Sequence, residues 1–489
     1  MPQSASPSQI QVSHTALQRC VAVHTQLHQA NLFGSPSPTQ DIRADFAPTT
    51  TWRISPTPFP LSTTQVQWFT DLGPHLLSFY RALNQLYLAS AKGTQPTWVA
   101  DYLDRGKPSA LVQYSRMKRF RDALPAVIRP DVIPTQDGMV ITELDSVPGG
   151  IGLTACLSRL YHDLDPDGSQ LVGGRDGMVQ RFGRMLHGAQ EAHLGSIVIL
   201  ISEEAKDYRA EMSWLAEQLR QKGMSVWCAQ PRDIRFTEEG LRLQTDQGEW
   251  PVGLIYRFYE LFDLLNIPKA ELVQYAVKKE VVAVTPPYKP ALEEKSAFAL
   301  FHHPVLRPFW EKALGPETVH LLTTVMPRTW ILDSTPIPPM ATIPGLQVSG
   351  RAVANWADLE TVTQKERQFV IKPSGFSELA WGSRGVSIGH DLPQTDWVTA
   401  LHQALSSFGT TPYILQEFHK GRVFEMDYLD ESSQTMVHMQ GRARLSPYYF
   451  VSDGKAELAG VLATVCPADK KILHGMKDAI MAPCALRPD

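Results

Sequence analysis

Two carboxylates and a glycine-rich turn stand together in one stretch of the sequence, Val140–Thr154. Glu143 and Asp145 are two residues apart on a short apolar run that predicts a buried strand, so both side chains should emerge on one face. The turn that follows contains Gly149 and Gly150, and glycines let backbone N–H groups approach an anion closely. Mg²⁺ prefers oxygen ligands and usually binds one or two carboxylates together with phosphates. The stretch is a candidate site for Mg²⁺ and phosphate oxygens; the alternative is a strand end with two solvated acids.

Cations and glycines that could bind a phosphate follow a second apolar strand. Phe369–Lys372 predicts a short strand that ends in lysine, and the loop after it contains Gly382, Arg384 and Gly385. Lysine holds a phosphate as a point charge, whereas arginine can hold it through two parallel hydrogen bonds. A mobile glycine loop can also close over a phosphoryl group and exclude water. We therefore predict that Lys372 and Arg384 hold the phosphates of a nucleotide.

A purine site is predicted at the end of the strand Tyr413–Phe418, which ends in polar groups. Backbone groups there could pair with the edge of adenine, while the side chain of Gln416 or Glu417 takes an adjacent donor. Together with the phosphate-binding loop, this strand favours ATP as the nucleotide. Lys295 lies on a predicted helix, where a lysine is usually solvated, so its position alone gives it no role.

The composition limits the class of protein. A chain of 489 residues is too long for one core, so two or three domains are expected. A net charge of −4 does not favour nucleic acid as a partner, and no apolar run reaches membrane-spanning length. The N-terminal stretch lacks the basic start and apolar core of a signal peptide. Five scattered cysteines without CxxC spacing predict reduced thiols, so we expect a cytoplasmic protein that binds neither membranes nor nucleic acid.

The elements that would position the candidate residues fall into four segments. Residues 1–60 are rich in Pro, Ser and Thr and predict a loosely ordered arm. Residues 61–190 carry the acidic strand, and residues 191–285 predict a small doubly wound α/β domain. Residues 286–489 carry the lysine strand and the glycine loop.

A further arginine and a further acid are expected to face the acidic strand. The run 126–133 predicts a short strand, and the Asp-Gly turn after it predicts antiparallel pairing with the acidic strand. Arg129 and Asp131 would then share a face with Glu143 and Asp145.

The third segment predicts a parallel sheet with one cation at its ligand-binding edge. Its strand–helix–strand unit, hairpin and third strand are expected over Ser196–Ser202, Ala205–Lys222, Met224–Ala229, Leu241–Trp250 and Pro251–Tyr259. Arg257 lies at the carboxyl end of the third strand, where ligands bind in open α/β sheets. The alternative is a surface arginine in an ion pair. Adjacent His302 and His303 would point apart on a helix, so we expect a surface position rather than a metal site.

The order of these pieces resembles that of the circularly permuted ATP-grasp enzymes, above all eukaryotic glutathione synthetase and, more distantly, glutathionylspermidine synthetase. In that family the acidic metal strand precedes the two ATP lysines. The resemblance spans most of residues 110–465 and rests on Arg129-Pro-Asp131, Glu143-Leu-Asp145, Ile255-Tyr-Arg257, Lys295, Phe369-Val-Ile-Lys372, Glu378, Tyr413-Ile-Leu-Gln416-Glu417 and Arg442 or Arg444. Three features depart from the family: Asp145 replaces an asparagine, Pro148 and Gly150 replace serines that bind the glutamyl group, and the glycine loop is longer.

The resemblance implies a mixed α/β (α+β) fold, namely a permuted ATP-grasp with a small doubly wound parallel domain inserted between its parts. Residues 61–190 and 286–489 would form its two parts, with residues 191–285 between them as a Rossmann-like substrate domain. It implies ATP and Mg²⁺ as cofactors. The implied metal ligands are Glu143, Asp145 and Glu378, and the implied nucleotide contacts are Lys295, Lys372, Gly382, Gly385, Gln416 and Glu417. The implied substrate contacts are Arg129, Asp131, Gly149, Gly150, Arg257 and Arg444, and the implied catalytic cations are Arg129, Arg384 and Arg442.

The function implied by the resemblance is an ATP-dependent carboxylate–amine ligase. It would join a small-molecule carboxylate to a small-molecule amine through an acyl phosphate and release ADP and phosphate, and the altered turn argues against glutathione as the product. A homodimer is left open. Two alternatives remain: a catalytically silent protein of the same fold that binds nucleotide or a protein partner, and a sugar- or nucleotide-binding α/β protein. A dinucleotide is disfavoured because no GxGxxG follows Ser196–Ser202.

Overall fold

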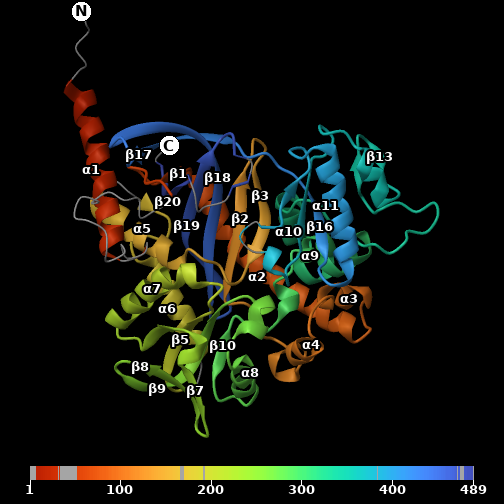
Figure 1. Cartoon of the computed structure of the whole chain (residues 1–489), viewed down its shortest axis with the longest axis horizontal. Coiled ribbons are helices and arrows are strands. Elements are labelled where there is room, and N and C mark those ends of the chain that lie inside the picture. Colours follow the sequence, from red (N-terminus) through yellow and green to blue (C-terminus); the bar gives the residue numbers. More distant parts are fainter. Residues whose placement is uncertain are drawn as a thin grey trace, which may run out of the picture.

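The computed structural model describes residues 7–30, 32, 52–165, 170–190, 193–380, 382, 384–470, 472–473 and 478–487. In these residues, a large sheet stands in the middle of Figure 1, a smaller sheet lies to its right, and a doubly wound sheet lies below. The mixed α/β class expected from the sequence is confirmed, whereas the permutation stays a prediction. No helix in the described part of the chain is long and apolar enough to cross a membrane.

The large sheet carries the acidic strand at its edge. Its order is β1 (Phe59–Leu61), β20 (Ile480–Leu486), β19 (Lys455–Pro467), β18 (Thr435–Ser452), β2 (Val127–Pro134) and β3 (Met139–Asp145), with β17 (Val423–Asp430) on β18 and β4 (Gln170–Leu171) on β20. β2 and β3 are antiparallel, with Arg129 opposite Asp145 and Asp131 opposite Glu143. The predicted hairpin is therefore confirmed, and the four side chains share a face.

The smaller sheet carries the lysine strand and the predicted purine strand side by side. Its order is β11 (Thr329–Ile331), β16 (Tyr413–Glu417), β14 (Phe369–Pro373) and β15 (Ser387–Ile388), and all its pairs are antiparallel. Apolar residues of the sheet pack against Trp397 and Leu401 of α11 (Gln394–Ser406), which are fully buried. A separate pair, β12 (Gln347–Val348) and β13 (Arg351–Ala352), lies beyond this sheet in Figure 1.

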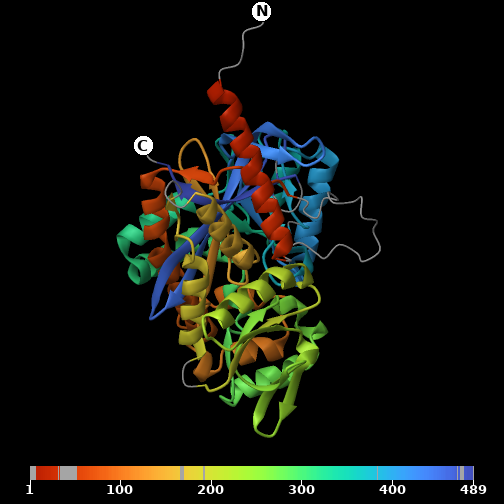
Figure 2. The ribbon, with the colours of Figure 1, turned by 90° about the vertical axis from the view of Figure 1, so that its left-hand side faces the viewer.

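The doubly wound sheet forms where the sequence pattern predicted it. β6 (Val226–Ala229), β5 (Ser196–Ile201), β9 (Gly248–Phe258) and β10 (Ala283–Thr285) are parallel, and α7 (Arg209–Gln221) connects β5 to β6. The predicted hairpin appears as β8 (Gly240–Thr245) paired with the first half of β9, and β7 (Ile234–Thr237) extends it. Figure 2 shows this sheet below the rest of the molecule.

Helices cover the large sheet and connect it to the doubly wound sheet. α2 (Thr63–Ala91) packs on β19 and begins with a capping box between Ser62 and Gln65. α6 (Gly177–Gln190) contacts β18 and β19 on one side and β9 and β10 on the other. The remaining α-helices are α1 (Pro7–Gln29), α3 (Trp98–Asp104), α4 (Ser109–Ser115), α5 (Ile151–Leu164), α8 (Ala270–Lys278), α9 (Ser296–His302) and α10 (Arg307–Val325).

Helix α1 shows how the first segment attaches. It lies along α5 at the edge of the molecule, as Figures 1 and 2 show. Cys20, Val23 and Leu27 are buried in the same apolar cluster as α5 and the doubly wound sheet. The rest of the predicted arm falls mostly outside the described residues.

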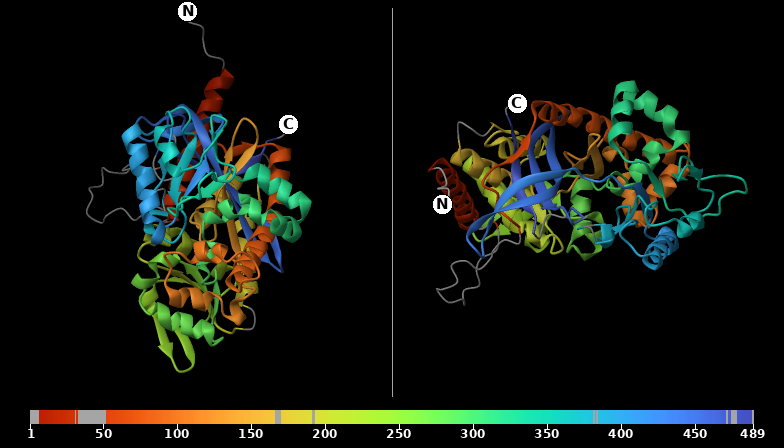
Figure 3. Two further views of the ribbon diagram at one scale, coloured as in Figure 1. Left: turned by 90° about the vertical axis from the view of Figure 1, so that its right-hand side faces the viewer. Right: turned by 90° about the horizontal axis from the view of Figure 1, so that it is seen from above.

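The large sheet also crosses the predicted segment boundaries, because β2 and β3 from the second segment pair with strands of the fourth. Figure 3 shows this sheet from the right-hand side of Figure 1 and from above, with the late strands beside the early ones. The four boundaries themselves stay a prediction.

Candidate functional site

Two lysines from separate elements reach the acidic strand β3. Lys295 precedes α9, and its Nζ lies 2.8 Å from Oε1 of Glu143. Lys372 on β14 donates from Nζ to the carbonyl of Thr142 at 2.8 Å. Burial disfavours the charged form of Lys295, but Glu143, Asp145 and Glu260 together outweigh this effect and raise the pKa of the lysine. The structure therefore brings together the acid and both lysines that the sequence singled out.

Strand β2 adds an ion-paired cluster on the same face. Arg129 lies 2.8 Å from Asp145 and 3.3 Å from Asp131. Arg444 on β18 lies 3.3 Å from Asp131, and the hydroxyl of Ser446 donates to that acid at 3.2 Å. Burial acts to raise the pKa of Asp131, yet the two arginines and the hydroxyl outweigh it, so the pKa is lowered. Asp131 is thus an ionised acid that holds two arginines in place.

A small cavity of about 50 Å³ opens beside these groups. Glu143 and Asp145 line it together with Lys295 and with two acids that the sequence analysis did not select, Glu260 and Glu293. Burial raises the pKa of Glu260, and repulsion from Glu293 and Asp145 raises it further. The only sequence signal for these two acids was their position, because Glu260 follows Arg257 at the end of β9 and Glu293 stands two residues before Lys295.

The donor set fits Mg²⁺ in part. Glu143 and Asp145 offer hard oxygen atoms on one strand beside Lys295 and Lys372, which suits an ion that shares its ligands with phosphates. Glu378 is exposed on a short 3₁₀ helix, Glu378–Ala380, and does not line the cavity. In the described part of the chain, no three His, Cys, Asp or Glu residues gather closely enough to hold a metal ion. Metal binding by all three acids stays a prediction.

The glycine turn holds a carboxylate of the chain itself. Glu211 on α7 accepts from the N–H groups of Gly150 and Leu153, each at 2.7 Å, at the start of α5. The ring of Tyr208 packs on Gly149, where an added Cβ would lie 2.1 Å from a ring carbon. The sequence predicted that Gly149 and Gly150 receive a substrate anion, but the structure places Glu211 on the turn. Glu211 was not selected because it lies far away in the sequence, on a helix that looked merely amphipathic.

The glycine loop starts from a buried network. The Ser374 carbonyl accepts from the N–H of Lys295 at 2.8 Å, and its hydroxyl accepts from the N–H of Ser296 at 2.9 Å and donates to Glu294. Glu294 also forms a fully buried ion pair with Lys107 at 2.5 Å. These contacts fix the first turn of the loop directly behind Lys295.

The far end of the loop reaches the doubly wound sheet. Arg384 forms an ion pair with Glu204 at 3.0 Å, and both side chains are partly exposed. Gly385 packs tightly on Pro373, where an added Cβ would lie 2.8 Å from the ring, and Gly382 has a φ of +63°. The loop in this state spans the space between the smaller sheet and the doubly wound sheet, and phosphate binding by Arg384 stays a prediction.

Strand β16 is held firmly where the purine was predicted. The amide of Gln416 donates to the hydroxyl of Thr329 at 3.1 Å, and Gln416 is buried. The N–H of Glu417 donates to the carbonyl of Arg328 at 2.9 Å, whereas its side chain is partly exposed. Of these two residues, Glu417 has the more accessible side chain.

Three arginines predicted to contact substrate or phosphate differ in their surroundings. Arg257 is fully buried and donates to Glu293 and to the carbonyls of Pro286 and Tyr259. These contacts favour the alternative interpretation, an arginine in an ion pair, although the pair is buried and not at the surface. Arg442 donates to the carbonyls of Gly421 and Ala468. Arg444 instead belongs to the cluster around Asp131. Of Arg442 and Arg444, the structure therefore places Arg444 in the candidate site.

Comparison with solved structures finds the same overall fold. A glutathione synthetase-like effector from Globodera pallida, in its apo form, aligns with a TM-score of 0.57 and 13% identity over 99% of this chain and 98% of its own. A candidate gamma-glutamylcysteine synthetase from Methylobacillus flagellatus KT aligns with a TM-score of 0.40 and 14% identity over 88% and 92% of the two chains. No protein-family model and no curated protein matches the sequence. The chain thus shares the fold of the effector, which agrees with the resemblance in the sequence.

Replacement of Lys372 should stabilise the empty protein. Burial, with Lys295 nearby, lowers the pKa of Lys372 from 10.5 to about 8, so the folded state disfavours the charged lysine. This destabilising effect is full below pH 8 and vanishes as the pH rises past 10.5. We expect Lys372→Met to raise the free energy of unfolding by about 2 kcal/mol at pH 7, and by about half as much at pH 9.5.

Urea unfolding of the ATP-free protein, followed by tryptophan fluorescence, measures this difference. Lys365→Met, at an exposed lysine in the same segment, is the matched control and should change stability by only a few tenths of a kcal/mol. A Lys372→Met protein that is less stable at pH 7, or whose gain persists unchanged at pH 9.5, would contradict the description of Lys372 as a buried, strained cation.

Removal of Glu211 should empty the glycine turn. Glu211→Ala leaves the N–H groups of Gly150 and Leu153 without their acceptor, so we expect a loss of about 2–3 kcal/mol in unfolding free energy. Formate should restore part of that loss, because a small carboxylate can enter the vacated turn. Thermal melts in sodium formate and in sodium chloride of equal ionic strength measure the rescue.

Glu217→Ala, at an exposed acid on the same helix, provides the control, with a small change and no rescue by formate. If Glu211→Ala were as stable as Glu217→Ala, Glu211 would not be the ligand of the turn.

Proposed function

We propose that this protein is an ATP-dependent carboxylate–amine ligase that forms an amide bond through an acyl phosphate. The observation that carries the proposal is the convergence on strand β3: Lys295 pairs with Glu143, and Lys372 binds the carbonyl of Thr142. Phosphate-binding lysines and metal-binding carboxylates are the groups that phosphoryl transfer needs, because its catalysis is mostly positioning and electrostatic stabilisation. The neighbouring pairing of β14 with β16 puts the predicted purine strand beside one of these lysines.

The contacts of Lys295 and Lys372 with β3 indicate how ATP would be bound. Phosphate oxygens would replace Glu143 and the Thr142 carbonyl as partners of the two lysines. Glu143 and Asp145 would then be free to hold Mg²⁺, which supplies charge neutralisation on the phosphates when bound. The cavity beside Glu143 is where the phosphates would enter, because it is lined by these acids on one side and by Gly375, at the start of the glycine loop, on the other.

The arginine–aspartate cluster is proposed to hold the carboxylate substrate. Arg129 and Arg444 flank Asp131, and Arg129 also reaches Asp145 next to the proposed phosphate site. A carboxylate bound by either arginine would lie on the same face of the sheet as Glu143. Asp131 would act as a positioning residue that keeps both guanidinium groups on this face.

The proposed reaction has two steps. A carboxylate oxygen of the substrate attacks the γ-phosphorus of ATP, the bond to the bridging oxygen breaks, and ADP leaves. An amine nitrogen then attacks the carbonyl carbon of the acyl phosphate, phosphate leaves, and the nitrogen loses a proton. The glycine loop, anchored behind Lys295 through Ser374, would exclude water while the acyl phosphate exists.

The substrates are proposed to be a small carboxylate and a small amine other than those that make glutathione. Glu211 and Tyr208 cover Gly149 and Gly150, so a substrate anion has no access to the N–H groups of that turn. A carboxylate there would also collide with the side chain of Glu211, which already occupies the turn. The acid substrate should therefore bind through the arginine cluster alone.

A catalytically silent protein of the same fold is the second candidate. Two observations favour it: Glu378 lies outside the cavity of the other acids, and Glu211 fills the turn expected to bind substrate. Such a protein would bind nucleotide or a protein partner without turning ATP over. The same assay separates the two candidates.

Mg²⁺-dependent formation of ADP should require Glu143. We expect wild-type protein to convert ATP to ADP and phosphate when pooled amino acids, small peptides and polyamines are present. Glu143→Gln should lower the rate by about 10²-fold or more, because the variant loses the carboxylate charge at the phosphate site. The variant should remain folded, because the amide oxygen of glutamine can still accept from Lys295 and the side chain at this position is about 31% exposed.

Glu457→Gln, at an exposed acid on β19, is the control and should keep full activity. AMP as the product would contradict the acyl-phosphate route. Equal ADP formation by wild type and Glu143→Gln would remove Glu143 from the site. Tight binding of Mg·ATP without turnover, in every substrate pool, would favour the silent candidate.

A further inference from the structure

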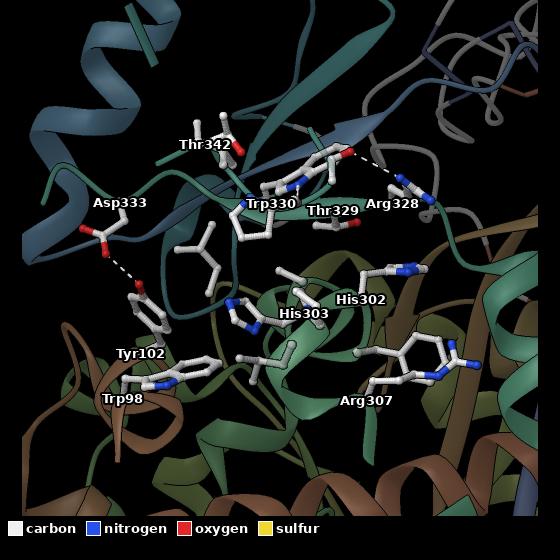
Figure 4. Close-up of a pocket in the computed structure, with 18 of the residues that line it drawn as sticks. Trp98, Tyr102, His302, His303, Arg307, Arg328, Thr329, Trp330, Asp333 and Thr342 are labelled. Atoms are coloured by element: carbon white, nitrogen blue, oxygen red, sulfur yellow. Dashed lines mark hydrogen bonds between the residues drawn. The ribbon is translucent and has the colours of Figure 1, made fainter. Parts of the chain in front are cut away.

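A large cavity of about 910 Å³ lies beside β11, which forms one edge of the smaller sheet. Its walls come from α3, the end of α9, the start of α10, β11 and the loop that follows β11 (Figure 4). None of its lining residues lines the cavity beside Glu143. Its volume is in the range of pockets that enclose small organic molecules. It is therefore a separate candidate for ligand binding.

Aromatic rings form one end of this cavity and are held in place without a ligand. Trp98 packs against His303 with ring centres 4.7 Å apart, and Tyr102 packs edge-on against Trp98 at 5.8 Å. The hydroxyl of Tyr102 donates to Asp333 at 2.6 Å, and the indole N–H of Trp330 donates to the carbonyl of Pro344 at 2.9 Å. Because the hydroxyl of Tyr102 and the indole N–H of Trp330 are already bonded within the wall, these two rings offer the cavity mainly apolar, flat surface.

Positive charge gathers at the other end of the cavity. Arg307 and Arg328 stand on the right of Figure 4, opposite Trp98 and Tyr102, with His302 between them. Burial, together with the charges of Arg328 and Arg307, lowers the pKa of His302 to about 4, so the histidine is neutral at pH 7 and both arginines act on the same space. His302 and His303 both line this cavity and are partly exposed.

The charges of the lining residues do not cancel. Asp333 is the one acid among them, and its carboxylate accepts from Tyr102 and from the N–H of Thr335 at 2.7 Å. Arg307 pairs with Glu311 through an exposed ion pair, which contributes little. Arg328 donates to the carbonyl of Gly345 at 3.2 Å, and its side chain is exposed. The cation end therefore has donors and net positive charge for an anion.

We propose that this cavity binds a planar aromatic anion, with its ring against Trp98 and His303 and its acidic group toward Arg307 and Arg328. A flat ring would stack on rigid aromatic walls at low entropic cost. A carboxylate or similar group would accept charge-assisted hydrogen bonds from the arginines. The proposal does not depend on the ligase function, because none of the lining residues lines the cavity beside Glu143. Arg328 and Thr329 of the lining do contact Glu417 and Gln416 of the predicted purine strand, so the probes are titrated without ATP.

Binding of 2-naphthoate, measured by isothermal titration calorimetry without ATP, tests the proposal. The neutral probe 2-naphthylmethanol has nearly the same shape and lacks the charge. We expect one molecule of 2-naphthoate to bind per chain and 2-naphthylmethanol to bind about tenfold or more weakly. Arg328→Gln should remove this preference while leaving the affinity for the neutral probe unchanged, and Trp98→Leu should weaken both probes.

Arg81→Gln is the matched control. Arg81 is also exposed, lines another large cavity and donates to a glycine carbonyl, that of Gly454, at 2.9 Å. This variant should bind both probes as wild type does. Retained binding of the neutral probe by Arg328→Gln shows that the cavity is still folded. Equal affinity for the two probes, no saturable binding of 2-naphthoate, or a preference that survives in Arg328→Gln and disappears in Arg81→Gln would each overturn the proposal.

Discussion

Lys295 and Lys372 carry their charges into a largely dehydrated junction, where an ammonium group is tolerated only beside an acid or a carbonyl. Both find that partner on the edge strand β3. This constraint draws α9 and β14 against the large sheet. The surrounding ion pairs serve the same junction, since Arg257 holds Glu293 and Lys107 holds Glu294 on the segment directly before Lys295. Burying so many charges lowers the stability of the folded chain. Such a cost is expected where the buried cations also bind an anionic ligand.

Local sequence patterns predicted the elements well, and long-range partners poorly. The β2–β3 hairpin and the strands β5 and β9 follow from apolar runs and turn residues, which act over a few positions. The pairing of β2 with β18, more than three hundred residues later, left no local signal. Glu211 was missed for the same reason, because its role exists only where α7 meets the start of α5. The surroundings of Arg257 likewise depend on a later segment that contains Pro286 and Glu293. The sequence pattern around Arg257 therefore left both a ligand-binding role and an ion-pair role open.

The resemblance in sequence motifs and the shared fold with the effector from Globodera pallida are independent observations that agree. At 13% identity they extend to the fold and not to substrates. The glycine turn that the family pattern assigns to the acid substrate is filled here by Glu211. Lys295, Lys372 and Glu143, which the pattern assigns to ATP and Mg²⁺, lie together. This division is physically reasonable, since phosphate oxygens are common to all users of ATP whereas acids and amines vary.

The most direct measurement of the central claim is calorimetric titration of ATP into wild type, Lys295→Gln and Lys372→Gln, each with and without Mg²⁺. If the two lysines and the acids of β3 form one nucleotide site, wild type binds one ATP per chain and binds it more tightly with Mg²⁺. Each variant should then lose about tenfold or more in affinity, as expected when a charge-assisted phosphate contact is removed. Unchanged affinity in both variants, or no binding of ATP by wild type, would contradict the claim that this junction is built for ATP.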